Sequence, residues 1–320
     1  MSLFTPPLAL FTNFLENKST GSTIIKVSLG AILLQRLRVA LQNLVYARDI
    51  ANEVAVITGA GSGIGKRMAL DLAKQGVRLA LWDISSTVND TAKEINDSGG
   101  EAIAYINDVS DREAVYKNAE LVIKDFGHVD MLFNNAGIVT GKSILDVPDA
   151  LAEKTMQINS VSHFWTVKAF LPGMMERDHG SVVTIASAAG LVGVAGLCDY
   201  CASKYAAIGF NEALRLELRK KGKFGVSTTL VCPYYINTGM FDGVKTRFPF
   251  GILLPILDPR YVSDMVIAAV KRKQEVLRMP RMMYSSDLLH FLLPVKIKDI
   301  VFEILGFSSA MDHFVQTRKL

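Results

Sequence analysis

Three side chains near the middle of the chain have the types and spacing needed to remove a proton from an alcohol. Tyr200 and Lys204 are four residues apart, so on a helix they share a face and the ammonium favours the ionised phenol. Ser187 ends an apolar run and can hold an oxygen by a hydrogen bond. Bringing a tyrosine near neutrality requires lowering its pKa by roughly 3 units, or about 4 kcal/mol, and one lysine supplies only part of that. Alone, this spacing occurs by chance on many helices and more often marks a surface pair.

Length and composition limit the classes of protein to consider. The 320 residues, 50% of them hydrophobic, can bury one large core. The net charge of +4 is small, and the basic residues form no aromatic-studded stripe, which argues against a nucleic-acid partner. The cysteines Cys198, Cys201 and Cys232 are too few for a disulfide framework and indicate a reducing compartment. Cys198 and Cys201 form a C-x-x-C without a second ligand pair, so we expect no metal site.

From residue 54 onward, short apolar runs alternate with helical stretches. This alternation predicts an α/β fold with a Rossmann-like, doubly wound parallel sheet and helices on both faces. In such sheets ligands bind at the carboxyl ends of the strands. We expect strands at 54–58, 77–82, 102–106, 131–133, 181–186 and 226–231, and helices at 64–75, 89–98, 112–126, 150–175 and 200–219.

A glycine-rich turn follows the first expected strand. The run Thr58-Gly-Ala-Gly-Ser-Gly-Ile-Gly65 lets the backbone approach a pyrophosphate, whose charge meets amides at the helix N-terminus. Its position between a strand and a helix is the context that dinucleotide binding requires. Asp83 ends the second strand and can accept hydrogen bonds from both adenosine ribose hydroxyls, which favours NAD over NADP. An aspartate that caps the next loop is compatible with this role.

With these motifs in order, the chain resembles the short-chain dehydrogenase/reductase family over roughly residues 52–280. The resemblance also rests on Asn107-Asp108-Val109, on Asn134-Asn135-Ala136-Gly137 and on Asn159. It implies a catalytic tetrad of Asn159, Ser187, Tyr200 and Lys204. The cofactor-binding residues that it implies are Gly59, Ser62, Gly63, Ile64, Gly65, Asp83, Asp108, Val109, Asn135, Ala136, Gly137, Tyr200, Lys204, Pro233, Ile236 and Thr238.

The chemistry expected of this tetrad is alcohol oxidation. Ser187 holds the substrate oxygen while Tyr200, as phenolate, removes the alcohol proton and hydride passes to the nicotinamide. Lys204 lowers the pKa of Tyr200 and, by the resemblance, binds the nicotinamide ribose. Asn159 is implied to hold a water that links the lysine to solvent. One departure from the family is Tyr234, which stands where a glycine is usual.

Further matches resemble one membrane-associated branch of the family, that of the retinol and 17β-hydroxysteroid dehydrogenases, and most closely the epidermal retinol dehydrogenases. They include residues 136–142, 164–172, 199–204 and 238–241. The resemblance implies oxidation of all-trans-retinol to retinal with NAD, and a homodimer formed through the helices near 150–175 and 200–219. The alternatives are a 17β-hydroxysteroid dehydrogenase or carbonyl reductase, and a catalytically idle scaffold at a lipid surface.

The loops around the expected site agree with a lipophilic alcohol as substrate. The stretch from Ser187 carries no charge until Asp199, and Met240, Phe241 and the apolar residues of 248–254 form a candidate lid. A pocket for a sugar would need more polar groups. Such loops can also simply pack on the core.

Both ends of the chain are expected to associate with a membrane. Residues 1–51 precede the catalytic domain at 52–280, and 281–320 form an apolar extension. Residues 23–45 are apolar but include Lys26, Arg36 and Arg38, each costing roughly 2.5–3.5 kcal/mol at a bilayer centre, which favours a helix lying in the interface. A helix packed on the protein itself or a targeting peptide are alternatives. We expect the endoplasmic reticulum membrane or a lipid droplet, with the catalytic domain on the cytosolic side.

Overall fold

The computed structural model describes residues 47–244, 254–306, 311–312 and 314–315. Contacts along the chain separate a unit Met1–Arg48 from a unit Asp49–Leu320, and the description below concerns the second. The expected membrane-associating segment at 1–51 lies almost wholly outside the described residues, as do residues 248–253 of the candidate lid. Within the described part of the chain, no helix combines the length and the apolar character needed to cross a membrane.

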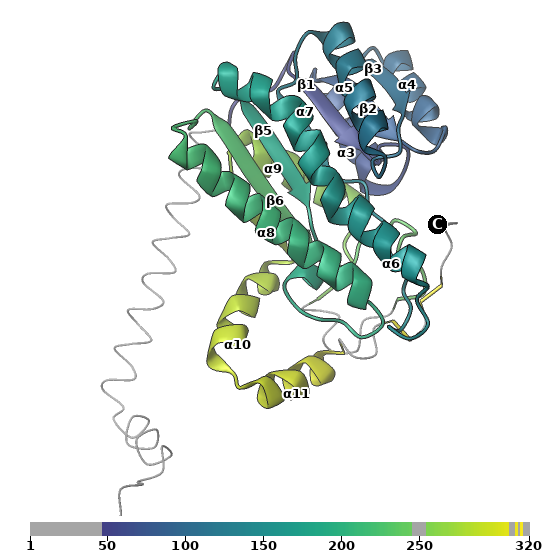
Figure 1. Ribbon diagram of the computed structural model, residues 1–320, viewed down its shortest axis with the longest axis vertical. Helices are drawn as coiled ribbons and strands as arrows, with labels where there is room; N and C mark the ends of the chain where they lie inside the picture. The colour runs from purple at the N-terminus through teal and green to yellow at the C-terminus, as the bar shows by residue number, and fades with distance from the viewer. Residues whose placement is uncertain (1–46, 245–253, 307–310, 313, 316–320) are drawn as a thin grey trace, which may run out of the picture. The chain divides into compact units, whose positions relative to one another are not determined.

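The centre of the fold is a parallel, seven-stranded sheet in the order β3-β2-β1-β4-β5-β6-β7 (Figure 1). The order reverses between β1 and β4, the topological switch point at which such sheets bind ligands. All six expected strands form, and the strand bounds are β1 Val54–Thr58, β2 Arg78–Asp83, β3 Glu101–Ile106, β4 Met131–Asn134, β5 Gly180–Ile185, β6 Val226–Pro233 and β7 Val276–Met279.

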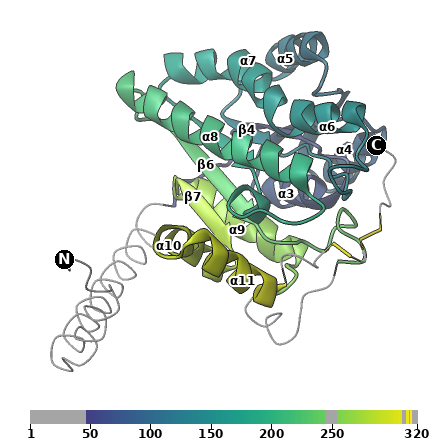
Figure 2. The ribbon, with the colours of Figure 1, turned by 60° about the horizontal axis from the view of Figure 1, so that its bottom comes forward.

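Helices cover both faces of this sheet (Figures 1 and 2). Alternate residues of β1 supply the two cores: Ala55 and Ile57 pack with α3, α4 and α9, whereas Val54 and Val56 pack with α5, α7 and α8. Burial on both sides explains why the central strands read as continuous apolar runs. The α-helices are α3 Gly63–Ala73, α4 Thr87–Asp97, α5 Arg112–Phe126, α6 Asp149–Met156, α7 Ser162–Glu176, α8 Cys198–Lys220, α9 Pro259–Lys271, α10 Ser286–Leu292 and α11 Val295–Leu305.

Three features differ from the expected elements. The single helix expected at 150–175 is wrong in its middle, because one π-helical turn, η1 (Gln157–Val161), separates α6 from α7. The helix α9 and the edge strand β7 were not anticipated. A signal for α9 exists at Asp258, whose carboxylate accepts hydrogen bonds from the backbone N–H groups of Arg260 and Tyr261 ahead of the helix.

The C-terminal segment leaves the sheet after β7 as a short 3₁₀ turn, η4 (Arg281–Ser285), followed by α10 and α11. Figure 1 shows these two helices as an arc beside the body of the fold. Leu288, Phe291 and Leu292 are exposed on α10, and Ile300 and Ile304 are exposed on α11. The inner side of α11 packs Phe302 and Leu305 against the rest of the protein.

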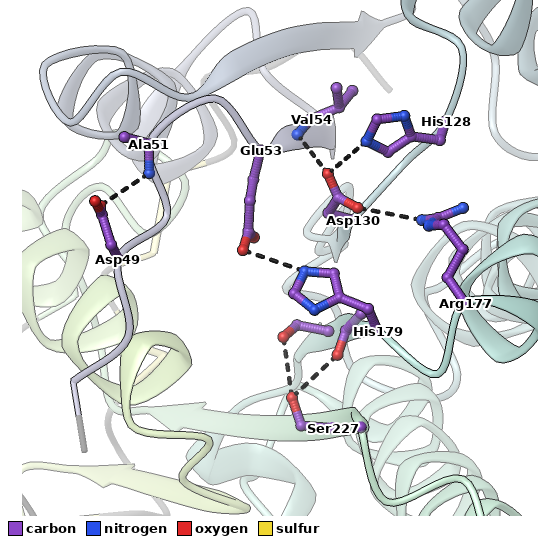
Figure 3. A network of polar contacts seen from close by, with 12 residues as sticks. Asp49, Ala51, Glu53, Val54, His128, Asp130, Arg177, His179 and Ser227 are labelled. Carbon is purple, nitrogen blue, oxygen red and sulfur yellow. Dashed lines mark hydrogen bonds and ion pairs between the residues drawn. The ribbon is translucent and has the colours of Figure 1, made fainter.

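A buried carboxylate joins the elements at the amino ends of the strands, opposite the expected site (Figure 3). Asp130 accepts hydrogen bonds from the Val54 backbone N–H at 3.0 Å and from Arg177 at 3.2 Å, and it lies 3.1 Å from His128. The contacts link β1 to the C-terminal end of α7. Asp130 therefore fixes how the strands on either side of the switch point begin.

Replacing this carboxylate should destabilise the fold. We expect Asp130→Ala to lower the free energy of unfolding by about 2–3 kcal/mol, because a buried backbone N–H loses its acceptor and Arg177 its partner. Urea unfolding of the full chain, followed by tryptophan fluorescence, measures this. Asp97→Ala is the control, since its ion pair with Lys93 is exposed and screened by solvent, so its loss should change the stability far less. If both variants lost the same free energy of unfolding, Asp130 would not have the structural role given to it here.

Candidate active site

The carboxyl ends of the central strands open into a cavity of about 550 Å³. Every residue that the sequence predicts to hold the cofactor lies along its wall, from the glycine turn after β1 to Thr238 beyond β6. Ser187, Tyr200 and Lys204 line the same cavity, whereas Asn159 is buried behind it. The fold thus brings together residues that are up to 179 positions apart, from Gly59 to Thr238.

The glycine turn leaves no room for side chains. Gly59 has a φ of +68°, and a Cβ on it would lie 3.0 Å from the Ala136 Cα. A Cβ on Gly65 would overlap the carbonyl oxygen of Gly59. The amide of Asn135 braces this turn by donating to the Thr58 carbonyl at 2.8 Å. The turn therefore offers bare backbone at the N-terminus of α3, which suits close approach of a phosphate.

Asp83 lies against this turn at the end of β2. Its Oδ2 accepts a hydrogen bond from the Gly61 N–H at 2.9 Å, and its Oδ1 accepts one from the Ser85 N–H at 2.9 Å. These bonds fix the carboxylate at the cavity wall. Each oxygen keeps a lone pair that can accept a hydroxyl donor.

The end of β3 contributes a further carboxylate. Asp108 pairs with Lys154 at 3.0 Å and accepts two hydrogen bonds from Ser110. Burial works to raise the pKa of Asp108, but the Ser110 and Lys154 hydrogen bonds outweigh it and hold that pKa below its usual range. The sequence alone assigns no separate role to Asn107, the neighbour of Asp108. Asn107 lines the cavity, and both polar atoms of its buried amide are without a hydrogen-bond partner among the described residues.

Ser187 and Tyr200 lie together where β5 ends and α8 begins. Ser187 caps the 3₁₀ turn η2 (Ala188–Gly190) by accepting from the Ala189 N–H at 3.1 Å. Tyr200 is 5% exposed, and burial raises its pKa above the ordinary value, while its hydrogen bond with Ser187 works in the opposite direction. An oxygen held by this pair can exchange a proton with the phenol.

Lys204 lies on the same side of α8 as Tyr200, as the i, i+4 spacing predicts, and its effect on the Tyr200 pKa stays a prediction. Its Nζ donates to the Ile185 carbonyl at 2.9 Å and lies 5.5 Å from the Tyr200 ring centroid. Burial lowers the pKa of Lys204 to about 8. The hydrogen bond that fixes the ammonium is the one to the Ile185 carbonyl at the end of β5. A phenolate at Tyr200 therefore needs positive charge beyond this lysine.

Asn159 acts as a brace within the protein. Its Oδ1 accepts from the Ile138 N–H at 2.9 Å, and its Nδ2 donates to the Ile138 carbonyl and to Ser203 Oγ, each at 2.9 Å. Ser203 in turn donates to the Tyr200 carbonyl at 2.7 Å. The side chain thus joins the loop after β4 to α8, and the expected water beside it stays a prediction.

A second buried carboxylate next to Tyr200 was not assigned a role from the sequence. Asp199 accepts hydrogen bonds from the hydroxyls of Thr140 at 2.8 Å and Thr155 at 3.2 Å. It ties the loop after β4 and the helix α6 to the first turn of α8. The only signal for it in the sequence is that Asp199 is the first charge after a long apolar stretch.

An apolar cavity of about 20 Å³ adjoins Ser187 and Tyr200 on the side away from the glycine turn. Apolar residues of the loop after Ser187 line this cavity, as the sequence predicts. Phe241 packs edge-on against Tyr200 with ring centroids 5.8 Å apart. The residues around this cavity are Ser187, Ala188, Ala189, Val194, Leu197, Tyr200, Tyr234, Tyr235 and Phe241.

A comparison with models of known protein families finds a match over most of the described domain. Residues 53–247 match the family model described as short chain dehydrogenase. The chain belongs to the short-chain dehydrogenase family. Within the described part of this short-chain dehydrogenase, no cluster of side chains has the composition of a metal site.

Individual relatives cover most of the protein. Epidermal retinol dehydrogenase 2 of Homo sapiens is 46% identical over 274 residues, covering 85% of this chain and 88% of the relative. Retinol dehydrogenase 10-A of Xenopus laevis is 40% identical over 298 residues, covering 85% of this chain and 87% of the relative. A short-chain dehydrogenase/reductase of Burkholderia phymatum, solved in complex with NAD, aligns with a TM-score of 0.69 at 25% identity over 85% of this chain and 100% of that one.

The buried lysine makes stability depend on pH. Between pH 8 and 10.5 the unfolded chain holds a proton on Lys204 that the folded protein has lost, so folding stability rises with pH in this window. We expect Lys204→Met to be more stable than the wild type by about 2 kcal/mol at pH 7, after allowing for the lost hydrogen bond. The difference should shrink toward pH 10.

Urea unfolding of both proteins at pH 7, 8.5 and 10 measures this difference. Lys271→Met is the control, because that lysine is a half-buried residue of α9 that donates to Gln75. A constant difference across the pH range would contradict a depressed pKa at Lys204.

Proposed function

We propose that this short-chain dehydrogenase uses NAD to oxidise a lipophilic alcohol, with all-trans-retinol as substrate and all-trans-retinal as product. One observation carries the proposal: Ser187 and Tyr200 line both the large cavity of about 550 Å³ and the small apolar cavity of about 20 Å³. A hydroxyl at this junction has a dinucleotide-sized space on one side and apolar walls on the other. The names of the relatives, retinol dehydrogenases at 40–46% identity, support the substrate.

The residues around the large cavity fit NAD. The glycine turn suits the pyrophosphate, and the unpartnered amide of Asn107 can pair with the adenosine half. Asp83 accepts the ribose hydroxyls and repels a 2′-phosphate. When bound, NAD supplies the nicotinamide carbon that accepts a hydride.

Side chains of this protein position the alcohol and accept its hydroxyl proton. Ser187 orients the alcohol oxygen, and Tyr200 takes its proton as the carbon loses hydride. Lys204, together with the positive charge that a bound nicotinamide would supply, favours the phenolate against the burial that raises the pKa of Tyr200. Lys204 holds the nicotinamide ribose while Asn159 keeps α8 in register with the loop after β4. In the reverse direction Tyr200 returns the proton.

We further propose that the protein works at a membrane. The exposed apolar side chains of α10 and α11 support docking to the endoplasmic reticulum membrane or a lipid droplet, where the alcohol is dissolved. The division of the chain would be an N-terminal segment 1–51, a catalytic domain 52–280 and a C-terminal extension 281–320. Exposed aromatic rings, Phe164 on α7 and Tyr205 on α8, support a homodimer through these helices.

Removing the tyrosine hydroxyl tests the proposed reaction. We expect Tyr200→Phe to reduce the conversion of all-trans-retinol to retinal by about 10²–10⁴-fold, the usual contribution of a general base. Membranes containing the full chain are incubated with NAD and retinol or estradiol, and products are separated by chromatography. Tyr261→Phe, at an exposed tyrosine of α9 outside both cavities, should keep full activity. Oxidation of estradiol alone would favour the steroid alternative, and no wild-type turnover with either alcohol would exclude the proposed function.

The preference for NAD is tested at Asp83. We expect Asp83→Ser to weaken NAD binding by about tenfold or more, because it loses charge-assisted bonds to the ribose hydroxyls, and to improve binding of NADP. Fluorescence titration with NADH and NADPH gives both dissociation constants. Asp90→Ser, an exposed position on α4, serves as the control. An unchanged ratio of the two constants would show that Asp83 does not select the cofactor.

A further inference from the structure

The described residues of the C-terminal tail lie against the wall of the small apolar cavity. The Val315 N–H donates to the Asp242 carbonyl at 2.9 Å, which fixes the tail beside the loop after β6. The Tyr235 hydroxyl lies 3.7 Å from the sulfur of Met311, and the Phe314 ring centroid lies 6.4 Å from that of Phe241. Both partners line the cavity, so the tail touches the pocket wall from outside.

A continuous line of rings connects the tail to the catalytic tyrosine. Phe241 packs edge-on against Tyr200 at 5.8 Å, against Tyr235 at 5.0 Å and against Phe314 at 6.4 Å. Only the ring of Phe241 therefore separates Phe314 from Tyr200. Close-packed rings of this kind transmit small displacements, because packed interiors have little free volume.

Two glycines provide space for the tail on loops far away in the sequence. A Cβ on Gly141, in the loop after β4, would overlap the ring of Phe314. A Cβ on Gly196, in the loop before α8, would touch Met311 at 3.5 Å. The tail thus fits between the two loops that border the site, instead of lying on an open surface.

The small cavity shares Tyr234 and Phe241 with the large cavity, so their walls set how much room lies beside Tyr200. Its volume of about 20 Å³ compares with the roughly 300–1,000 Å³ of ordinary ligand pockets. An extended alcohol beside Tyr200 needs more room than this small cavity alone provides, so the position of its wall matters. Tyr235 and Phe241 are the parts of this wall that the tail supports from behind.

We propose that Met311 and Phe314 are specificity-determining residues, which set the length and width of the alcohols admitted beside Tyr200. They act by supporting Tyr235 and Phe241, and they need not touch the reacting atoms. This inference rests on the proposed function, because it concerns the apolar part of the same substrate. The tail adjusts the shape of the pocket, while Ser187 and Tyr200 define its chemistry.

Variants of opposite size at one position test the proposal. Phe314→Ala opens space behind Phe241, and Phe314→Trp fills it. We expect the ratio of kcat/KM for estradiol to that for 1-decanol to rise by about tenfold in the alanine variant and to fall in the tryptophan variant, within the range expected for a change of pocket size. Val315→Ala is the matched control, since Val315 is 56% exposed and keeps its backbone hydrogen bond.

The measurements use the full chain in membranes with NAD, and a second readout is the dissociation constant for retinol, followed by energy transfer from protein to retinol fluorescence. Opposite shifts in the two Phe314 variants, with Val315→Ala unchanged, support the inference in either readout. Equal losses for every alcohol in both variants, with no shift in the retinol dissociation constant, would overturn it. If the wild type oxidises retinol but neither the ratio nor the retinol dissociation constant responds, the inference fails and the proposed function stands. If retinol binding shifts but no alcohol is oxidised, the proposed function fails instead.

Discussion

The hydrogen bond from the Lys204 ammonium to the Ile185 carbonyl is the contact on which the site depends. It joins α8 to the end of β5 in the interior of the protein, where a cation is costly unless a fixed acceptor meets it. With Lys204 fixed, Tyr200 one turn earlier on the same helix is fixed as well, and its hydroxyl reaches Ser187 at the start of the next loop. The burial that lowers the pKa of Lys204 also raises that of Tyr200. The resting pair is therefore poorly suited to form a phenolate, and the missing positive charge is one that an oxidised nicotinamide carries.

Around this pair the fold separates two environments. On one side, bare glycine backbone, Asp83 and the unpartnered amide of Asn107 offer hydrogen bonds to a polar, charged ligand. On the other side, the loops after β5 and β6 and the tail present aliphatic and aromatic side chains. The second environment is built from segments that do not belong to the sheet, so its shape can change while the sheet and the cofactor side stay constant.

The sequence predicted the sheet well because its signals are local. Central strands such as β1 are buried on both faces and read as unbroken apolar runs, and the glycine turn has a composition that few other structures require. The break at Gln157–Val161 was missed because a single π-turn changes no residue type and barely disturbs helical periodicity. The edge strand β7 was missed because Val276–Met279 is short and includes Arg278, which resembles a loop as much as a strand.

By itself, the sequence determined which chemical groups this protein has and which of them follow the carboxyl ends of the strands. Spacing along a helix placed Tyr200 and Lys204 on one face, and the turn residues marked where a phosphate fits. Only the tertiary structure decided what each group contacts: Lys204 donates to the Ile185 carbonyl while it lies over the Tyr200 ring, Asn159 is a brace, and Phe314 packs against Phe241. The reason is that pKa values and pocket shape depend on burial and on neighbours distant in the chain, and neither is encoded in local spacing.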